Sequence, residues 1–406
     1  MDTISDKRIF CRKLEFQLEN LNNDIQKLKA LDELISHYKL TNISKAITYL
    51  EMQRKIMNSN EDKEIELNYY LNTAFIENQL YNYKESVQFY NKALIVIEEV
   101  GTIQEEAEAL IDLAGTCINM NMIDTSLHYL EKAEQLLKGF PGNRFDYRIL
   151  CRKGFINLKF GVLSKSIEVL LEAEKGISNL KSLSNKDHYF RTLILSGLGK
   201  IYELNNEPQK STEAYLKVVK CCQKVGMKSR LSWHYLNLGK AYMAEDNIHD
   251  AILYLSKSII ENNDINEESI AGSLANLGYC YFQLNKLNKA KELYNQSYQI
   301  YKKNKNSNLN NLSELESMMA QLFERLNNHK KVINHYLRSL KYAKKENNFY
   351  QISFVCLKIA NYYELQNFIK EALSYTKLYI SFREKSELEI NKRKIRELEI
   401  KFEIEN

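Results

Sequence analysis

The chain has 406 residues, with 57 basic and 52 acidic side chains and a formal net charge of +5 at pH 7. Because the two signs of charge nearly balance, the composition does not favour the strongly basic surface of a nucleic-acid-binding protein. Only two prolines and 13 glycines are present, while 44% of the residues are apolar and 27% are charged. This combination favours amphipathic helices throughout, and hence an all-α protein.

The N-terminal stretch MDTISDKRIFCRKLEFQLEN is charged throughout and lacks the apolar stretch of a secretory signal. No run of about 18 apolar residues occurs, so the sequence predicts no membrane span. The seven cysteines are odd in number, and none has the paired spacing of a zinc site. We expect a cytoplasmic protein with reduced thiols, without a metal or another cofactor, and with neither membrane nor nucleic acid as a direct partner.

The first predicted element is an N-terminal helix. The stretch CRKLEFQLENLNNDIQKLKAL has the composition of one helix and precedes a repeating pattern. We assign residues 1–26 to this helix and expect it to cap the element that follows.

A helical hairpin then repeats over residues 27–380. In one copy Tyr235, Leu238, Gly239 and Tyr242 follow the i, i+3, i+4, i+7 spacing of one helical face. After the polar break AEDN, a second helix begins with Ala251 on its inner side. The small residues at Gly239 and Ala251 allow the two helices to approach closely.

This close-contact point recurs at intervals of 39 to 45 residues. It falls at Leu34, Ala74, Ala114, Gly154, Gly199, Gly239, Gly278, Ala320 and Ala360. The longest interval contains NLKSLSNKDHYF, where we expect a longer loop. Pro208 is expected in the first turn of a second helix, where proline is tolerated.

The copy with Leu277, Gly278, Tyr281, Ala290 and Tyr294 resembles the tetratricopeptide signature. The resemblance implies an all-α, right-handed superhelical solenoid of about nine hairpins, with the first helix of each hairpin on a concave face. The period near 40 is longer than that of the commonest tetratricopeptide repeat.

The sequence contains no catalytic motif that we can identify. The phosphate loops GxxxxGK and GxGxxG, the zinc motif HExxH and the nucleophile elbow GxSxG do not occur. We therefore predict a protein that is not an enzyme.

The candidate binding residues lie on the first helices, away from the packing face. Trp233, Asn237 and Lys240 follow an i, i+4, i+7 spacing that turns them toward the concave groove. Residues at the same repeat position in different copies form a column. The column of Asn237 also contains Asn72 and Asn276, with Asp32 and Asp112 as acidic variants. The column of Lys240 also contains Lys200 and Tyr279.

These residue types suit peptide capture. One asparagine amide donates to a backbone carbonyl and accepts from a backbone N–H, a lysine binds a carboxylate, and Trp233 or Tyr279 offers an apolar platform. The resemblance implies the same use, because tetratricopeptide proteins that bind peptides use asparagines of this column. Asparagine is plentiful in the chain, so composition alone is the alternative explanation of the column.

The last predicted element is a charged helix over residues 381–406, with the sequence FREKSELEINKRKIRELEIKFEIEN from Phe382 onward. Leu388, Ile395, Leu398 and Phe402 form a short heptad seam that Asn391 interrupts. The helix either caps the last hairpin or joins two chains in a homodimer. It resembles the connector of bacterial tetratricopeptide regulators that precedes a diguanylate cyclase, a histidine kinase or a DNA-binding domain.

These features together predict a non-catalytic module that binds a protein or peptide in the concave groove and acts as a scaffold or sensor in cytoplasmic, bacterial signalling. One alternative is a Rap-type receptor for a peptide pheromone that binds or dephosphorylates a response regulator. Another is the sensory part of a longer cyclase, kinase or transcription regulator.

Overall fold

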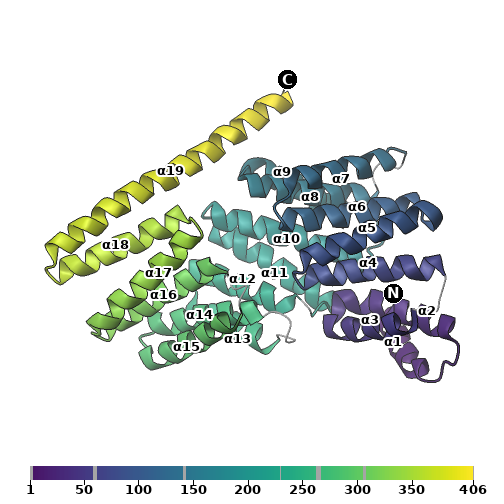
Figure 1. Cartoon of the computed structure of the whole chain (residues 1–406), viewed down its shortest axis with the longest axis horizontal. Helices are drawn as coiled ribbons and strands as arrows, with labels where there is room; N and C mark the ends of the chain where they lie inside the picture. Colours follow the sequence, from purple (N-terminus) through teal and green to yellow (C-terminus); the bar gives the residue numbers. More distant parts are fainter. Residues whose placement is uncertain are drawn as a thin grey trace. The chain divides into compact units, whose positions relative to one another are not determined.

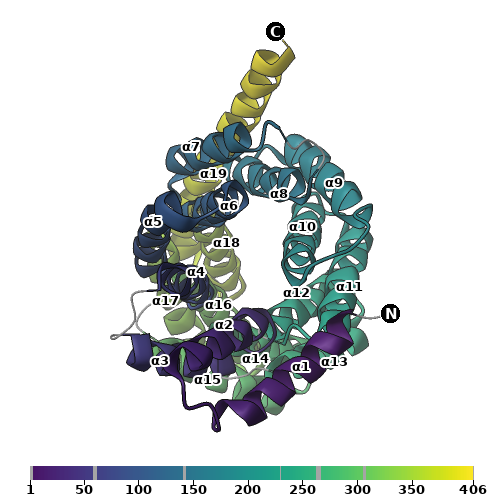
Figure 2. The same cartoon turned by 90° about the vertical axis from the view of Figure 1, so that its right-hand side faces the viewer.

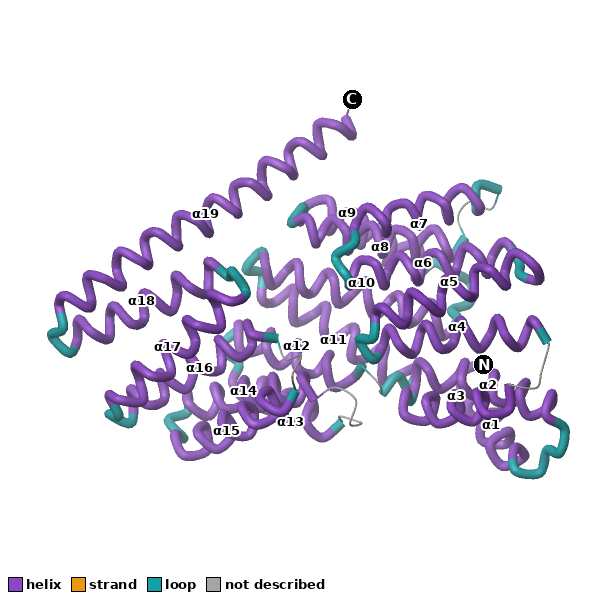
Figure 3. The backbone as a smooth tube through the Cα atoms, viewed as in Figure 1, coloured by secondary structure: helices purple, strands orange, loops and turns teal. Residues whose placement is uncertain are grey.

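The computed structural model describes residues 3–57, 62–139, 143–228, 230–261, 267–304 and 308–405. Within these ranges the regular elements are 19 α-helices joined by short connections (Figure 3). The chain divides into two compact units, unit 1 with residues 1–234 and unit 2 with residues 235–406. The boundary falls inside helix α12, and each unit is described below by itself.

Unit 1 contains one N-terminal helix followed by five hairpins (Figure 1). Its helices are α1 (Thr3–Leu18), α2 (Asp24–Thr41), α3 (Ile43–Met57), α4 (Lys63–Gln79), α5 (Tyr83–Val100), α6 (Ile103–Asn119), α7 (Ile123–Leu136), α8 (Arg144–Phe160), α9 (Leu163–Ser178), α10 (Asn185–Leu204), α11 (Pro208–Val225) and the start of α12 (Leu231–Ala244). Helix α1 packs on α2 with Cys11 fully buried, and Lys45 donates to Glu15 over 2.7 Å.

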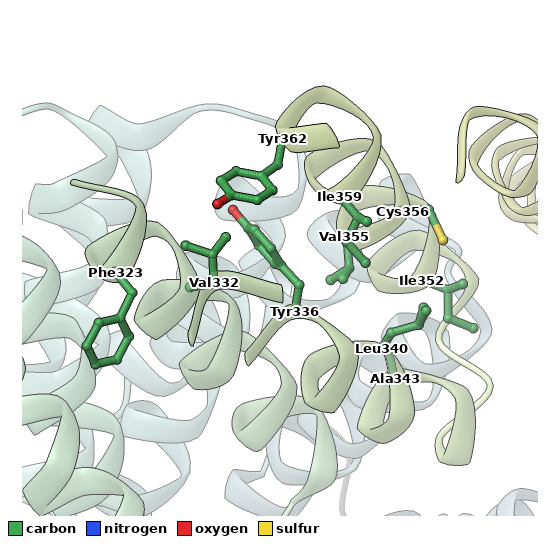
Figure 4. Packing of buried hydrophobic residues seen from close by; sticks show 11 residues of the cluster. Phe323, Val332, Tyr336, Leu340, Ala343, Ile352, Val355, Cys356, Ile359 and Tyr362 are labelled. Carbon is green, nitrogen blue, oxygen red and sulfur yellow. The ribbon is translucent and has the colours of Figure 1, made fainter. Parts of the chain in front are cut away.

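Unit 2 continues the same pattern. Its helices are the rest of α12, then α13 (Ile248–Ile260), α14 (Glu267–Gln283), α15 (Leu287–Lys303), α16 (Leu309–Arg325), α17 (His329–Lys345), α18 (Phe349–Leu365) and α19 (Ile369–Glu405). Its apolar core includes a cluster between α17 and α18, where Tyr336 and Val332 lie against Val355 and Ile359 (Figure 4).

The predicted close-contact residues hold the hairpins together. A Cβ added to Gly239 would lie 2.6 Å from Cγ of Leu255, and one added to Gly278 would lie 2.7 Å from the Tyr294 ring. All nine predicted points fall in the first helix of a hairpin, from α2–α3 to α18–α19. The prediction of about nine hairpins is therefore confirmed for the residues that the structure describes.

Eight turns inside these hairpins contain a residue with positive φ, seven positions after the close-contact residue. They are Tyr81, Asn121, Gly161, Asn206, Asp246, Asn285, Asn327 and Asn367. Glycine and asparagine adopt this left-handed conformation more readily than other residues. Part of the asparagine content of the chain therefore has a backbone role.

The longest repeat interval was expected to contain a longer loop, and this prediction is wrong. The connection before α10 spans only residues 179–184, while α10 has 20 residues and α8 has 17. Ser184 caps α10 in a capping box with Asp187, so the polar stretch NKDH starts a helix. Pro208 occupies the first turn of α11, as predicted.

The first helices of unit 1 enclose a narrow interior. Figure 2 shows α4, α6, α8 and α10 on the inside of this unit, with α5, α7, α9 and α11 outside them. Helix α2 contacts α10, and the Lys228 N–H donates to the Thr41 carbonyl over 3.2 Å. The first and fifth hairpins of unit 1 therefore touch, which surrounds the inner face with helices.

Helix α19 is one helix of 37 residues, so the charged segment continues the second helix of the ninth hairpin. Leu388 and Ile395 of the predicted seam are 55% and 56% exposed. Neither side chain is therefore packed against the last hairpin. No described helix has both the length and the apolar character that a membrane crossing needs.

Candidate functional site

Four of the predicted binding residues lie on the first helices of two successive hairpins in unit 2. Asn237 and Lys240 belong to α12, and Asn276 and Tyr279 occupy the same columns of α14. Lys240 is exposed, whereas Tyr279 is half-buried, with its ring 6.2 Å from the ring of Phe282.

The two asparagines of unit 2 differ in their hydrogen bonds. The Nδ2 atom of Asn276 donates to the Gly272 carbonyl of its own helix over 2.8 Å. The Nδ2 atom of Asn237 is buried and finds no hydrogen-bond partner among the described residues. An unsatisfied buried donor costs about 1–3 kcal/mol, so Asn237 is a donor that gains from a ligand acceptor.

The other three predicted residues belong to unit 1 and do not form one cluster. Lys200 is exposed and pairs with Glu203 of its own helix over 2.9 Å. Trp233 is 41% exposed. Asn72 is buried on α4, where its Oδ1 accepts from Lys39 Nζ over 2.8 Å. Asn72 is thus engaged within the chain and lies among the charged residues of the inner face.

Ion pairs fill the inner face of unit 1. Asp112 on α6 accepts from Lys186 of α10 over 2.6 Å and from Arg152 of α8 over 3.4 Å. The Arg152 Nε also donates to the Ile111 carbonyl over 3.2 Å. These bonds connect three first helices through one carboxylate.

A second set of ion pairs lies one helical turn closer to the open ends of the hairpins. Arg148 donates to Asp187 over 2.8 Å and to Glu108 over 3.1 Å, and Arg144 reaches Asp187 over 2.9 Å. Lys186 also pairs with Glu108. The side chains of Arg148 and Asp187 are 3% and 0% exposed. The turn that the longer α10 adds therefore supplies two members of the network.

Burial and neighbouring charges shift the pKa values of several groups at this inner face. Burial raises the pKa of Glu108, but Lys186 and Arg148 overcome that effect and lower it to about 2. Burial and the neighbouring Lys186 lower the pKa of Lys39 to about 8. Burial also raises the pKa of Asp32 to about 7, against the hydrogen bonds from Gln53 and Asn68. Burial is the larger cause of the Lys39 shift, and the nearby carboxylates of Glu108, Asp112 and Asp32 oppose it.

A cavity of about 80 Å³ opens among these helices. It is lined by Phe75, Asn78, Tyr90, Asp112, Gly115, Ile118, Asn119, Arg152, Phe155, Tyr189, Leu193 and Arg230. A Cβ added to Gly115 would lie 2.4 Å from Cζ of Arg152, so the glycine makes room for the guanidinium group. The lining combines two cations, amides and aromatic rings.

The charged network was missed at the level of the sequence, although a signal for it exists. Asp112 and Arg152 occupy the same column 40 residues apart, and so do Glu108 and Arg148. Opposite charges exactly one repeat apart indicate ion pairs between successive first helices. The sequence prediction placed Asp112 in the asparagine column but did not pair it with Arg152 in the next copy.

The described residues contain no group of three histidine, cysteine, aspartate or glutamate side chains placed to hold a metal ion. Six of the seven cysteines are buried, and Cys221 is half-buried. Neither observation adds a chemical centre to the inner faces described above.

Comparisons with known proteins agree with this fold. A tetratricopeptide-repeat family model matches residues 269–345, and no curated protein matches the chain. The fold is similar to that of aspartyl phosphate phosphatase F from Bacillus subtilis, with a TM-score of 0.53 and 13% identity over 87% of this chain and 92% of that one.

Two further solved structures have a similar fold. A Rap protein complexed with competence and sporulation factor has a TM-score of 0.56 and 14% identity over 84% of this chain and 93% of its own. NprR in complex with its cognate peptide NprX has a TM-score of 0.52 and 13% identity over 84% and 95%. The repeat signature and the matched segment identify tetratricopeptide repeats over residues 269–345, and the stacked hairpins extend the same fold through the rest of the described chain.

Proposed function

We propose that the protein binds a peptide, or an extended segment of a partner protein, on the inner faces of its hairpins and acts as a non-catalytic sensor or scaffold. The observation that carries the proposal is the buried, unpartnered Nδ2 of Asn237, in the same column as Asn276. A peptide backbone offers a carbonyl acceptor every 3.3–3.5 Å or so along an extended chain, which suits amides on successive helices.

The side chains beside the asparagines extend this match. Lys240 is exposed on the same helix as Asn237, and Tyr279 lies beside Asn276 with a half-buried ring. They supply a cation for an acidic group and an apolar platform for a side chain. The similar structures of a Rap protein with competence and sporulation factor and of NprR with NprX support a ligand of this kind.

A ligand that bridges several first helices would change the angles between hairpins. Each hairpin of a solenoid packs mainly on its neighbours, so small changes accumulate along the array. The ligand shifts the array toward the arrangement that it binds more tightly, and a partner reads that arrangement.

The experiment selects octapeptides from a displayed random library on the full chain and measures their dissociation constants by fluorescence anisotropy. The variant Asn237→Ala/Asn276→Ala is expected to bind the selected peptides at least tenfold more weakly. The control Asn288→Ala/Asn295→Ala removes two exposed asparagines from the outer helix α15 and is expected to bind like the parent.

Circular dichroism checks that both variants keep the helical content of the parent. Failure to enrich any peptide would refute peptide binding. Equal affinity of the parent and the Asn237→Ala/Asn276→Ala variant would place the binding site elsewhere.

A Rap-type receptor that binds or dephosphorylates a response regulator is the second candidate. It is favoured by the similarity to aspartyl phosphate phosphatase F over most of both chains. The test incubates a phosphorylated response regulator with the full chain and follows the phosphate released. Release at the rate of the regulator alone, together with no co-elution on a sizing column, would exclude this candidate.

We also propose that α19 joins two copies of the chain. Its outward face carries five half-exposed aliphatic residues, Ile369, Leu373, Ile380, Leu388 and Ile395, opposite the side chains that pack on the last hairpin. Light scattering is expected to show a dimer that Leu388→Glu/Ile395→Glu converts to a monomer, and a monomeric parent would refute the pairing.

A further inference from the structure

We propose that the cavity between α4, α6, α8 and α10 of unit 1 binds a carboxylate group, held mainly by Arg152 and Arg230. The carboxylate belongs either to a bound peptide or to a free small acid. The peptide source rests on the function proposed above, whereas the site itself stands on the charges, packing and shape of the cavity.

The cavity has more positive than negative charge. Two guanidinium groups line it, from Arg152 and Arg230, and Asp112 supplies its carboxylate. Asp112 is already paired with Lys186 over 2.6 Å, and its contact with Arg152 is longer, at 3.4 Å. Within the part of the chain that the structure describes, no carboxylate lies within ion-pair distance of Arg230. A second anion would therefore complete the local charge balance.

Aromatic rings hold the two guanidinium groups without neutralising them. Cζ of Arg230 lies 5.3 Å from the centre of the Tyr189 ring, and Cζ of Arg152 lies 4.7 Å from that of Phe190. Stacking on a ring fixes the plane of the guanidinium and keeps its edge N–H groups directed outward. Arg152 already donates through Nε to the Ile111 carbonyl and through Nη2 to Asp112, so it offers a ligand only its remaining N–H groups. The rings thus orient the donors before a ligand arrives.

Gly115 gives independent evidence that this geometry is selected. A glycine in the interior of a helix costs about 1 kcal/mol relative to alanine. Gly115 lies in the middle of α6, and an added Cβ would lie within 2.7 Å of three guanidinium atoms of Arg152. The glycine therefore lowers the stability of α6 at the position where the Arg152 guanidinium group needs space.

The size and charge of the cavity select a carboxylate among anions. A planar carboxylate matches the fork of a guanidinium group through two parallel hydrogen bonds. A volume of about 80 Å³ accommodates such a group. Asp112 on the wall repels phosphate, which concentrates up to two charges in one group, more strongly than a single carboxylate group, so phosphate fits less well. The amides of Asn78 and Asn119 add donors at the same wall.

Two arms of one experiment test the proposal on the full chain. In the first arm, calorimetry measures binding of acetate and succinate. In the second arm, the dissociation constants of octapeptides selected on the parent are measured with a free C-terminal carboxylate and with a C-terminal amide. The same measurement is made after each aspartate or glutamate of the peptide is replaced by asparagine or glutamine. The parent is expected to bind at least one carboxylate form at least tenfold more tightly than its amide, or to bind succinate directly.

Three variants locate the effect. Arg230→Gln removes one cation, and Gly115→Ala keeps every charge but displaces the Arg152 guanidinium, so both are expected to reduce carboxylate binding at least tenfold. Arg325→Gln is the matched control, because Arg325 also lies over a ring, Phe282 at 5.4 Å, but in unit 2 and outside the cavity. It is expected to bind like the parent, and circular dichroism confirms that each variant is folded.

The outcomes separate this inference from the proposed function. Peptides that bind equally well as acid and amide, together with no binding of acetate or succinate, overturn the carboxylate site and leave peptide binding intact. Succinate binding that Arg230→Gln abolishes, without any selected peptide, supports the site with a small acid as its ligand and refutes peptide binding. If neither arm shows carboxylate binding, or if Arg230→Gln and Gly115→Ala bind like the parent, the proposal is wrong.

Discussion

The two units contain the same kind of hairpin, but a serine hydrogen bond joins its two helices at different positions in each unit. In unit 1 a serine lies 12 residues after the close-contact residue and donates to that residue's carbonyl over 2.7–2.9 Å, at Ser86, Ser126, Ser166 and Ser211. In unit 2 this position holds Ala251, Ala290, Val332 and Ala372. The serine appears seven residues later instead, at Ser258, Ser297 and Ser339.

This exchange moves the polar contact along the hairpin. Ser126 lies near the start of α7, close to the turn, and bonds to the Ala114 carbonyl. Ser297 lies in the second half of α15 and bonds to the Ala271 carbonyl over 2.7 Å, nearer the open end. Most of these contact points hold a small residue, with Val332 as an exception, and either point accepts a hydroxyl group.

The inner faces of the two units differ more strongly. Successive first helices of unit 1 are linked by ion pairs between residues such as Asp112 and Arg152. The same column of unit 2 holds Asn237, Asn276, Met318 and Lys358, with one charge among four residues. One unit therefore gains cohesion from charges across its interior, while the other depends on apolar clusters and offers amides to a ligand.

The largest expected effect comes from breaking the buried network of unit 1. Asp187→Ala leaves Arg148, which is 3% exposed, with one partner fewer in a buried site. The loss of a buried partner costs about 3–5 kcal/mol. Urea unfolding followed by Trp233 fluorescence is expected to show this loss for unit 1.

The double replacement Arg148→Met/Asp187→Leu serves as the control for that variant. Replacing both charges by apolar groups of similar size is often close to neutral. We expect it to recover the part of the stability lost by leaving Arg148 without Asp187, while the loss of the capping box with Ser184 and of the pair with Arg144 is common to both variants. A double variant as unstable as Asp187→Ala would show that the Arg148 charge is not the source of the loss.

The close-contact glycines should behave alike in the two units. Gly154→Ala brings a Cβ within 2.6 Å of Leu170 in unit 1, and Gly278→Ala brings one within 2.7 Å of Tyr294 in unit 2. Overpacking of this kind costs about 1–3 kcal/mol, partly offset by the better helix propensity of alanine. Thermal unfolding is the measurement, with Gly139→Ala, which meets no atom within 4 Å, as the control.

The stability of unit 1 should depend on pH through Asp32. Burial raises the pKa of Asp32 in the folded state to about 7, from an ordinary value of 3.8. Between pH 3.8 and pH 7 the carboxyl loses its proton in the unfolded state but keeps it in the folded state, so the free energy of unfolding falls as pH rises. Above pH 7 the whole destabilisation from burying this carboxyl is present. Asp32→Asn removes this cost while keeping an acceptor for Gln53.

The expected gain of Asp32→Asn is about 4 kcal/mol at pH 8, because the shift spans about three pKa units at about 1.4 kcal/mol each. At pH 4 the gain falls below about 1 kcal/mol, since the folded carboxyl is protonated and the unfolded one is only about half ionised. Urea unfolding at both pH values measures it. An equal effect at the two pH values would mean that the replacement acts through packing and not through the proton.

Much of the fold could be predicted from the sequence because close helix contacts restrict residue size. Ala114, Gly154 and Gly278 stand at such contacts, and their spacing alone located the hairpins. The start of α10 was misread because the polar stretch NKDH resembles a loop, although Ser184 and Asp187 form a capping box there.

The candidate site was less predictable. A column of asparagines can be predicted from the sequence of each first helix separately. The bond from Lys186 to Asp112, in contrast, joins α10 to α6 and depends on how the hairpins of unit 1 curve around one another. Such a contact follows from the accumulated angles between hairpins, which no local pattern encodes. Arg230 lies in a connection between helices, where the repeat frame gives no column at all.

The smallest expected effects test the serine exchange itself. Ser126→Ala removes one buried hydrogen bond from a carbonyl that keeps its bond within the helix, so we expect a loss of about 0.5–1.5 kcal/mol. Ala133 occupies the later contact point of the same hairpin and is fully buried. The double variant Ser126→Ala/Ala133→Ser therefore gives this hairpin of unit 1 the pattern of unit 2. If each point accepts a hydroxyl because of local geometry alone, calorimetric unfolding should show the double variant recovering the lost stability. A double variant less stable than Ser126→Ala would instead show that each unit's helices are spaced for their own contact point.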